Sequence, residues 1–367
     1  MTARPMRIAY VINSVEGGGA ASPVPAILDV LRQGGAEVAV FALTPRDRRG
    51  EPAMRAAGID VRVRDGGETD HLAALRWLDA TLRDWAPTHL WTSLTRATLL
   101  GQLVALRRGW PVVSWQHAAS LKPANRILLR RLQRLSRLWV GDSATVTRLT
   151  ADRLHVPPER LTQWSIFRAD PVARQATPWQ PGQPVRIGSL GRLHTVKGYD
   201  VLVAALALVE TTTPYEVVIA GDGAQRRALE DQAQTLGVET LRFAGYAKDP
   251  GAFLAGCHLY VQPSRSEGLC VAVHEAMQAG LPVVASAVGE ISASVVEGES
   301  GMTVPPGDPA ALAAALSALL EDPARLAEMG QAARTRVLAL FGPERFAATG
   351  LAILARMRGF GSGDPAS

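Results

Sequence analysis

The chain has 367 residues, 47% of them hydrophobic and 20% charged, which is the composition of an ordinary soluble globular protein. This length exceeds the usual size of a single hydrophobic core, so two domains are expected. The two cysteines, Cys257 and Cys270, form no metal-binding or redox motif and fit a reducing compartment. The apolar run at 8–12 is too short for a signal peptide, and no run of about 18 apolar residues could span a bilayer. We therefore expect a cytoplasmic protein.

Charge is divided unevenly between the two halves of the chain. Residues 1–182 contain 25 Lys and Arg against 15 Asp and Glu, whereas residues 183–367 contain 14 against 19. A basic first half suggests an anionic partner for that half alone. A general preference of the source proteome for arginine would explain the same excess without a partner.

Short apolar strands alternate with helical patterns along the first half, an order typical of a parallel sheet covered on both faces. The predicted strands are 7–13, 37–43, 88–92, 111–115 and 138–141, and the predicted helices are 24–33, 71–84, 96–107 and 125–137. A Pro-rich segment at 171–184 then predicts a linker.

The same alternation restarts after the Pro-rich segment. The predicted strands are 185–190, 215–220, 241–244, 259–262 and 282–285, the predicted helices are 199–210, 224–235 and 270–279, and three closing helices are 309–321, 323–340 and 343–358. The predicted fold class is α/β, with two tandem Rossmann-like domains of doubly wound parallel sheet. A ligand crevice is expected between the domains, at the carboxyl ends of their strands.

A run of three glycines, Gly17, Gly18 and Gly19, follows the first predicted strand. Glycine lets backbone amides approach an anion closely, although a plain tight turn would use the same residues. The spacing is not a dinucleotide fingerprint, because Ser22 stands at the last small position and the second strand ends at Thr44 without an acid. An NAD-dependent enzyme is therefore disfavoured.

Two further segments carry polar groups at the ends of predicted strands. Arg192 and Lys197 flank a turn that leads into a helix, which suits a diphosphate, although solvated surface cations would look the same. The second segment places Glu267 just before a predicted helix and Glu275 inside it, within an apolar stretch. The amides of residues 269–271 would lie at the start of that helix. A buried, unpaired Glu275 is costly unless hydroxyl donors, such as those of a ribose, satisfy it.

Together these motifs resemble the retaining glycosyltransferases of family four. The matching motifs are Gly-Arg-Leu at 191–193, Lys-Gly at 197–198, Glu-Gly-Leu at 267–269, Glu-Ala-Met at 275–277, Gly280 and Pro-Val-Val-Ala at 282–285. Supporting similarities are Gly-Asp-Gly at 221–223, Phe243 with Gly245, and Pro-Pro-Gly-Asp-Pro at 305–309. The resemblance covers nearly the whole chain and is strongest from 185 to 322. It implies the GT-B fold, with an acceptor-side domain at 1–170, a linker at 171–184, a nucleotide-sugar donor domain at 185–342, and a C-terminal helix at 343–367 that packs back on the first domain.

The resemblance also implies roles for individual residues. Arg192 and Lys197 would neutralise the donor diphosphate, and the amides of Leu269, Cys270 and Val271 would bind a phosphate oxygen. Glu275 would take the ribose hydroxyls, and Glu267 would contact the donor sugar near its reacting face. The loop of Gly18 and Gly19 would approach the diphosphate from the other domain. His117, which follows a predicted strand, would contact the transferred sugar, although a histidine in such a place is as often structural.

The implied activity is that of a retaining hexosyltransferase that requires no metal ion and no cofactor, with a nucleotide sugar, a UDP- or GDP-sugar, as the donor substrate. No Asp-x-Asp pair occurs in the sequence, which agrees with transfer without a required cation. The departing diphosphate would take the proton of the acceptor hydroxyl, so no strong general base is needed.

Three departures from the family pattern put donor identity in doubt. Cys270 stands where a small glycine is common. After Gly289, the usual second glycine is Glu290 and the usual later glutamate is Ala293. The Asn-Gly turn often found before the linker is replaced by Ile-Phe-Arg at 166–168.

A basic segment at 121–139 contains no acid and predicts an amphipathic helix, with Leu128, Leu132, Leu135 and Trp139 on one face. Its basic residues are Lys122, Arg126, Arg130, Arg131, Arg134 and Arg137. Such a helix can lie on an anionic membrane surface at the inner face of the plasma membrane, or simply pack its leucines on the sheet. On the first interpretation a polyprenyl-diphosphate-linked or other lipid-linked glycan is the natural acceptor, as in exopolysaccharide or lipopolysaccharide assembly. A nucleic-acid partner is disfavoured.

Two other functions remain compatible with the sequence. A GT-B sugar-nucleotide epimerase would use the same kind of site without an acceptor. A non-catalytic protein that only binds nucleotide sugar would also keep the phosphate and ribose residues.

Overall fold

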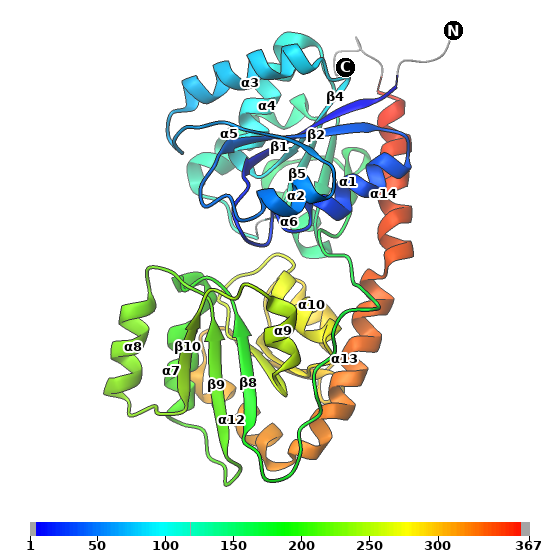
Figure 1. Cartoon of the computed structure of the whole chain (residues 1–367). Helices are drawn as coiled ribbons and strands as arrows, with labels where there is room; N and C mark the ends of the chain where they lie inside the picture. Colours follow the sequence, from blue (N-terminus) through cyan, green and yellow to red (C-terminus); the bar gives the residue numbers. More distant parts are fainter. Residues whose placement is uncertain (1–4, 118, 361–367) are drawn as a thin grey trace. The chain divides into compact units, whose positions relative to one another are not determined.

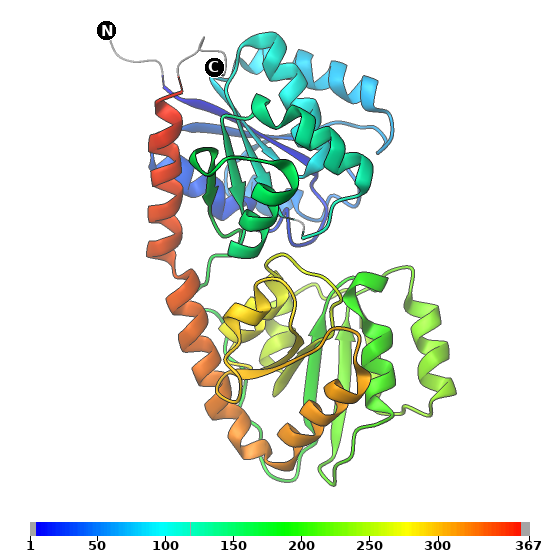
Figure 2. The same ribbon diagram turned by 180° about the vertical axis from the view of Figure 1, so that it is seen from behind.

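The computed structural model of the chain describes residues 5–117 and 119–360. It contains two compact units: unit 1 comprises Met1–Arg168 and Glu344–Ser367, and unit 2 comprises Ala169–Pro343. Each unit has a parallel β-sheet with helices on both faces (Figures 1 and 2). The predicted α/β class with two Rossmann-like sheets is confirmed.

The sheet of unit 1 has seven described strands, all parallel. In order across the sheet they are β3 (Asp60–Val63), β2 (Glu37–Thr44), β1 (Arg7–Ser14), β4 (His89–Ser93), β5 (Val112–Gln116), β6 (Leu138–Gly141) and β7 (Leu161–Gln163). The order reverses at β1, so β1 and β4 flank the switch point at which doubly wound sheets bind ligands.

Helices of unit 1 cover both faces of this sheet (Figure 1). They are α1 (Val24–Gln33), α2 (Glu51–Ala56), α3 (His71–Trp85), α4 (Thr95–Arg108), α5 (Pro123–Leu132), α6 (Ala144–Leu154) and α14 (Pro343–Arg358), with 3-10 turns η1 (Gln133–Leu135) and η2 (Pro158–Arg160). Alternate strand residues such as Val11 and Phe41 pack against Leu78 of α3 and Val104 of α4. This is the near-continuous burial that a parallel sheet covered on both faces requires.

The opposite face of the same sheet carries a tryptophan cluster. Trp91, Trp115 and Trp164 lie with ring centroids 5.0–5.7 Å apart, and Phe346 of α14 packs on Trp164 at 5.1 Å. The Trp164 indole N–H donates to the carbonyl of Phe346 at 2.9 Å. The C-terminal helix is thus part of the core of unit 1, although the rest of unit 1 lies at the start of the sequence.

Unit 2 has a six-stranded parallel sheet. In order across the sheet its strands are β10 (Leu241–Gly245), β9 (Tyr215–Ala220), β8 (Val185–Leu190), β11 (Leu259–Gln262), β12 (Val283–Ser286) and β13 (Gly301–Val304). One face is covered by α7 (Tyr199–Leu206), α8 (Arg226–Thr235) and α12 (Pro309–Glu321), and the other by α9 (Pro250–Ala255), α10 (Val271–Gln278), α11 (Ile291–Ser294) and α13 (Leu326–Phe341) (Figures 1 and 2). The 3-10 turns are η3 (Thr195–Lys197) and η4 (Pro323–Arg325).

The Pro-rich segment at 171–184, predicted as a linker, is hydrogen-bonded to unit 2. The amide of Ala176 donates to the carbonyl of Ala279 at 2.7 Å, and that of Thr177 to the carbonyl of Ala255 at 3.1 Å. Arg334 of α13 also donates to the carbonyls of Pro171 and Gln278. These bonds hold the segment against unit 2 rather than leaving it free.

One stretch of the described chain, Pro323–Arg358, is long and apolar enough to cross a membrane by length and composition alone. It contains α13 and α14. The apolar residues have packing roles, because Val337 and Phe341 are buried in unit 2 and Ile353 and Leu354 are buried in unit 1.

Candidate functional site

The segments that follow β8 and β11 lie against each other in unit 2, because the two strands are neighbours in the sheet. Gly198 has φ +66°, and a Cβ on it would lie 2.0 Å from the carbonyl oxygen of Pro263. The amide of Arg265 donates to the carbonyl of Val196 at 2.8 Å. Only glycine permits this approach, so the backbone itself fixes the two loops together.

Lys197 and Glu267, which the sequence selected 70 residues apart, meet across these loops. Lys197 Nζ lies 2.7 Å from Glu267 Oε1, and Ser264 Oγ donates to the same oxygen at 2.6 Å. Burial opposes the charge on Lys197, but attraction and hydrogen bonding to Glu267 outweigh it and raise the pKa of the ammonium above its usual value. Gln262 donates in turn to Ser264 at 2.8 Å, so a network rooted in β11 fixes the Glu267 carboxylate. Arg192 lies exposed in the same β8–η3 segment.

The backbone changes direction at Cys270, the N-cap of α10. Cys270 has φ 64° and ψ 74°, a left-handed conformation in which glycine is favoured. This conformation explains why a glycine is common at the position. Among residues 5–117 and 119–360, no hydrogen bond to the amides of Leu269, Cys270 or Val271 is present. Three donors at a helix N-terminus are therefore available to an anion.

Glu275 lies in the second turn of α10, half-buried. Within the described ranges its carboxylate makes no hydrogen bond or ion pair. Burial raises the pKa of this carboxyl to about 7. A half-buried carboxylate without a partner is costly, so this position favours a ligand that brings hydroxyl donors.

Two residues that the sequence analysis gave no role support this edge of unit 2. Gly289 has φ +58°, and the amide of the next residue, Glu290, donates to the carbonyl of Gly268 at 2.9 Å. His274 is fully buried, with Nδ1 2.9 Å from the carbonyl oxygen of Cys270 and Nε2 2.8 Å from Ser294 Oγ. Burial lowers the pKa of His274 to about 4, so the ring is neutral. The sequence does carry a signal for His274, because a histidine inside an otherwise apolar helix needs polar partners.

His117 lies at the carboxyl edge of the unit 1 sheet, directly after β5. Its Nε2 is 2.8 Å from Ser93 Oγ, and its Nδ1 is 3.5 Å from Asp142 Oδ2. The ring also packs on Trp115, with centroids 5.4 Å apart. Both ring nitrogens thus face polar groups of unit 1, a feature that the sequence did not predict.

The glycine loop of unit 1 leaves open space around its backbone. Gly18 has φ +153° and is exposed, and neither Gly18 nor Gly19 would bring a Cβ within 4 Å of any other group. The amide of Gly17 donates to Asp47 at 3.0 Å. Space inside unit 1 therefore does not require glycine at 19, whereas the φ of Gly18 by itself favours glycine. Close approach of an anion would favour glycine at both positions.

The predicted helix at 125–137 is wrong at its end and in its buried face. The helix α5 spans Pro123–Leu132, the 3-10 turn η1 follows, and Trp139 belongs to β6. Leu129 is the fully buried residue of α5, packed with Trp139, whereas Leu128 is 45% exposed. The prediction treated α5, η1 and β6 as a single helix. The helical period used to place the apolar face therefore did not match the structure.

The arginines of this basic segment are nevertheless accessible. Arg126, Arg130, Arg131 and Arg134 are exposed and Arg137 is half-buried. In the part of the chain that the structure describes, none of these five forms an ion pair with an acid. Beside them, Ile127 is 49% exposed.

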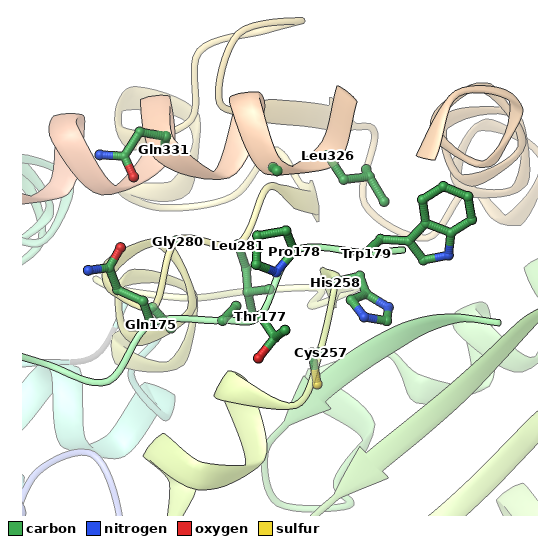
Figure 3. A pocket seen from close by; sticks show the side chains of 13 residues that line it. Gln175, Thr177, Pro178, Trp179, Cys257, His258, Gly280, Leu281, Leu326 and Gln331 are labelled. Atoms are coloured by element: carbon green, nitrogen blue, oxygen red, sulfur yellow. The ribbon is translucent and has the colours of Figure 1, made fainter. Parts of the chain in front are cut away.

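A pocket in unit 2 lies at the other end of the sheet, beside residues that precede strands β11 and β12 (Figure 3). It contains about 460 Å³ of empty space, its open mouth included, and Trp179, His258, Leu281 and Gln331 are among its lining residues. No Lys, Arg, Asp or Glu lines it. It lacks the charge that a diphosphate requires and is separate from Arg192, Lys197 and Glu267. Among residues 5–117 and 119–360, no cluster of three or more His, Cys, Asp or Glu side chains could hold a metal ion.

Comparison with known proteins gives the class to which this fold and site belong. The sequence profile of the family described as "Glycosyl transferases group 1" matches residues 173–336. The GDP-mannose-dependent alpha-(1-6)-phosphatidylinositol monomannoside mannosyltransferase of Mycolicibacterium smegmatis is 30% identical over 267 residues, which cover 68% of this chain and 69% of that protein. The chain belongs to the group 1 glycosyltransferases.

Other relatives match a smaller part. Glycogen synthase of Mycobacterium tuberculosis is 36% identical over 182 residues, which cover 48% of this chain and 44% of that protein. The chain thus spans less than half the length of that relative. Among solved structures, Anabaena HepE in complex with UDP-glucose is similar with a TM-score of 0.84 and 20% identity, over 96% of this chain and 100% of that one. This similarity confirms the predicted GT-B fold.

Proposed function

We propose that the chain transfers a sugar from a nucleotide sugar, a UDP- or GDP-sugar, to a hydroxyl group of an acceptor, with retention of configuration. The observation that carries this proposal is the edge of unit 2 where Lys197, three unpaired amides and the unpaired Glu275 gather. Cations and amides suit a diphosphate, and a carboxylate suits the hydroxyls of a ribose. Membership of the group 1 glycosyltransferases supports this assignment.

Each group has a role in the proposed reaction. Arg192 and Lys197 neutralise the diphosphate as it leaves, and the amides of residues 269–271 bind a phosphate oxygen. Glu275 accepts hydrogen bonds from the ribose. Glu267, held by Ser264, contacts the donor sugar near its reacting face. His117 contacts the transferred sugar, and the loop of Gly18 and Gly19 approaches the diphosphate.

The proposed chemistry needs neither a metal ion nor a cofactor. The bond between the anomeric carbon and the diphosphate oxygen breaks, and the acceptor oxygen bonds to the same face of that carbon. The proton of the acceptor hydroxyl passes to the departing diphosphate. The protein contributes position and charge, which are the main sources of rate when no side chain acts as a strong base.

For the acceptor we propose a lipid-linked glycan, used in polysaccharide or glycoconjugate assembly by a cytoplasmic enzyme at the inner face of the plasma membrane. The relative from Mycolicibacterium smegmatis is named for a phosphatidylinositol monomannoside, and one from Rhizobium leguminosarum for lipopolysaccharide core biosynthesis. In this chain, the exposed arginines of α5 and η1 lie beside exposed Ile127 and Leu128. Such a combination of cations and apolar side chains suits the surface of an anionic bilayer.

The donor site is tested by thermal unfolding of the full chain with UDP, GDP, ADP and their common sugar conjugates. One selective nucleotide should raise the melting temperature, because binding to the folded state stabilises it by mass action. Glu267→Ala should keep most nucleotide affinity and lose at least tenfold in transfer. Unchanged transfer by this variant would contradict the role of Glu267, and no stabilising nucleotide would contradict the donor site.

The membrane surface is tested with vesicles that contain anionic lipid. Replacing Arg130, Arg131 and Arg134 together with Gln should weaken sedimentation with the vesicles, because each cation near such a surface contributes about 1 kcal/mol. Replacing Arg76, Arg227 and Arg345, which are exposed and lie elsewhere, is the matched control. Equal sedimentation of the first variant and the wild type would refute membrane contact by α5.

A further inference from the structure

Three polar side chains from adjacent strands meet in one row at the carboxyl edge of the unit 1 sheet. Ser93 ends β4, His117 follows β5 and Asp142 follows β6. His117 Nε2 is 2.8 Å from Ser93 Oγ, and its Nδ1 is 3.5 Å from Asp142 Oδ2. Ser93 is fully buried, and the side chains of Asp142 and His117 are 3% and 8% exposed.

The identity of these partners selects one form of the imidazole ring. At 3.5 Å from Asp142 Oδ2, Nδ1 makes no hydrogen bond within the described residues. An ionised carboxylate only accepts hydrogen bonds, so its position beside Nδ1 favours a proton on that nitrogen. In a neutral ring, Nε2 is then the acceptor, and Ser93 donates to it. Asp142 therefore favours the Nδ1–H tautomer, as an orienting carboxylate does for a histidine elsewhere.

Backbone strain at Leu94, the residue after Ser93, accompanies this arrangement. Leu94 has φ 75° and ψ 159°, a region that non-glycine residues rarely adopt, at a cost of about 1–3 kcal/mol. Contacts on both sides impose this conformation: Leu94 N donates to the Trp115 carbonyl at 3.4 Å, and the Leu94 carbonyl accepts from Thr98 at 2.9 Å. Strain of this kind persists where the surroundings fix the geometry, as they do around Ser93.

We infer that Asp142 is a positioning residue, which holds His117 in the Nδ1–H tautomer so that Nε2 is presented as a hydrogen-bond acceptor. In this tautomer Ser93 Oγ, 2.8 Å away, donates to Nε2, and a hydroxyl of the transferred sugar takes its place during turnover. This use of Nε2 rests on the proposed function. The tautomer itself does not, because it is argued from side chains of unit 1.

The tautomer is measured by two-bond proton–nitrogen correlation spectra of the full chain, labelled with nitrogen-15 in histidine. His117→Gln identifies the signal. The wild type should show a proton on Nδ1 and none on Nε2. Asp142→Asn keeps an oxygen acceptor and should keep this pattern, whereas Asp142→Leu should lose it. A wild-type ring protonated only on Nε2 would overturn the inference, whether or not Asp142→Leu folds.

Transfer kinetics then test the consequence of the tautomer. Asp142→Leu should reduce kcat at least tenfold without changing the dissociation constant of the nucleotide, whose predicted contacts are the donor residues of unit 2 and the loop of Gly18 and Gly19. Asp142→Asn should stay within threefold of the wild type. An unchanged kcat in Asp142→Leu would refute positioning by Asp142. Absence of transfer by the wild type would refute the proposed function instead, and the spectra would still test the tautomer.

Discussion

A Cβ placed on Gly289 would lie 2.3 Å from the carbonyl oxygen of Glu267 and 2.4 Å from that of Gly268. Gly289→Ala must therefore move the Glu267 turn and strain a left-handed residue, which together should lower the free energy of unfolding by about 2–4 kcal/mol. Nucleotide affinity should fall at least tenfold. Urea unfolding and a nucleotide titration measure both effects.

The matched control for this change is Gly298→Ala. Gly298 has a similar φ of +71°, but no atom lies within 4 Å of the position of its Cβ. The Gly298→Ala variant should have a free energy of unfolding lower by only about 1 kcal/mol, the cost of the left-handed conformation, and should keep its nucleotide affinity. Equal losses in the two variants would show that contact with the Glu267 turn is unimportant.

Glu275 predicts a particular dependence of stability on pH. Its pKa is raised from 4.5 to about 7, so the folded protein holds a proton that the unfolded chain has released between these values. Stability should therefore fall as pH rises from 4.5 to 7, by up to about 3 kcal/mol. Glu275→Gln should remove this contribution and be the more stable protein at pH 8. Urea unfolding at several pH values tests this, and an unchanged pH dependence in Glu275→Gln would contradict it.

The residues of the donor edge differ in how far sequence could predict them. Arg192, Lys197, Glu267 and Glu275 follow strands whose carboxyl ends share one edge, so their proximity could be expected. The orientation of Glu267 depends on Ser264 and on Gly289, which approaches from the segment after β12. A contact of that kind depends on loop conformation, for which hydrophobic periodicity gives no signal.

Hydrophobic periodicity also limits how well the boundaries of helices and strands can be predicted. The long buried strands were predicted within a few residues, because continuous apolar runs mark them. The short edge strands β3, β7 and β13 were missed, since three or four residues that are only partly buried carry no clear period. In α5 the predicted apolar face included Leu128, yet Leu129 packs on Trp139. A ten-residue helix followed by a 3-10 turn is too short for the period to locate its face.

Helix α14 tests how tightly a distant element is built into unit 1. A Cβ on Gly350 would lie 2.4 Å from the ring of Trp164 and 2.7 Å from a methyl group of Val30. Gly350→Ala improves helix propensity by about 1 kcal/mol, but the clash should still make the protein less stable by about 1–3 kcal/mol. Ala348→Gly on the exposed side of α14 reports propensity alone and should cost about 1 kcal/mol. Greater stability of Gly350→Ala in thermal unfolding would contradict close packing of α14 on Trp164.

At the scale of the whole molecule, the chain leaves unit 1 after Arg168 and returns to it at Glu344. The two crossings are adjacent, because the amide of Ala169 donates to the carbonyl of Phe341 at 2.8 Å. Unit 2 is therefore a continuous segment with its own sheet and core, whereas unit 1 requires both ends of the sequence. The predicted donor residues thus belong to unit 2, whereas His117 and the basic helix belong to unit 1.

The consequence is that the two units should differ as isolated fragments. Residues 169–343 should unfold cooperatively and retain nucleotide binding, because the core and the donor edge are both complete. Residues 1–168 alone should not fold, since loss of α14 exposes Trp164 and removes the buried Phe346, Ile353 and Leu354. Joining 1–168 to 344–360 through a short flexible linker should restore cooperative unfolding, because the two crossings are adjacent. Urea denaturation followed by tryptophan fluorescence decides this: a fragment 1–168 that folds as well as the joined form would show that α14 is dispensable.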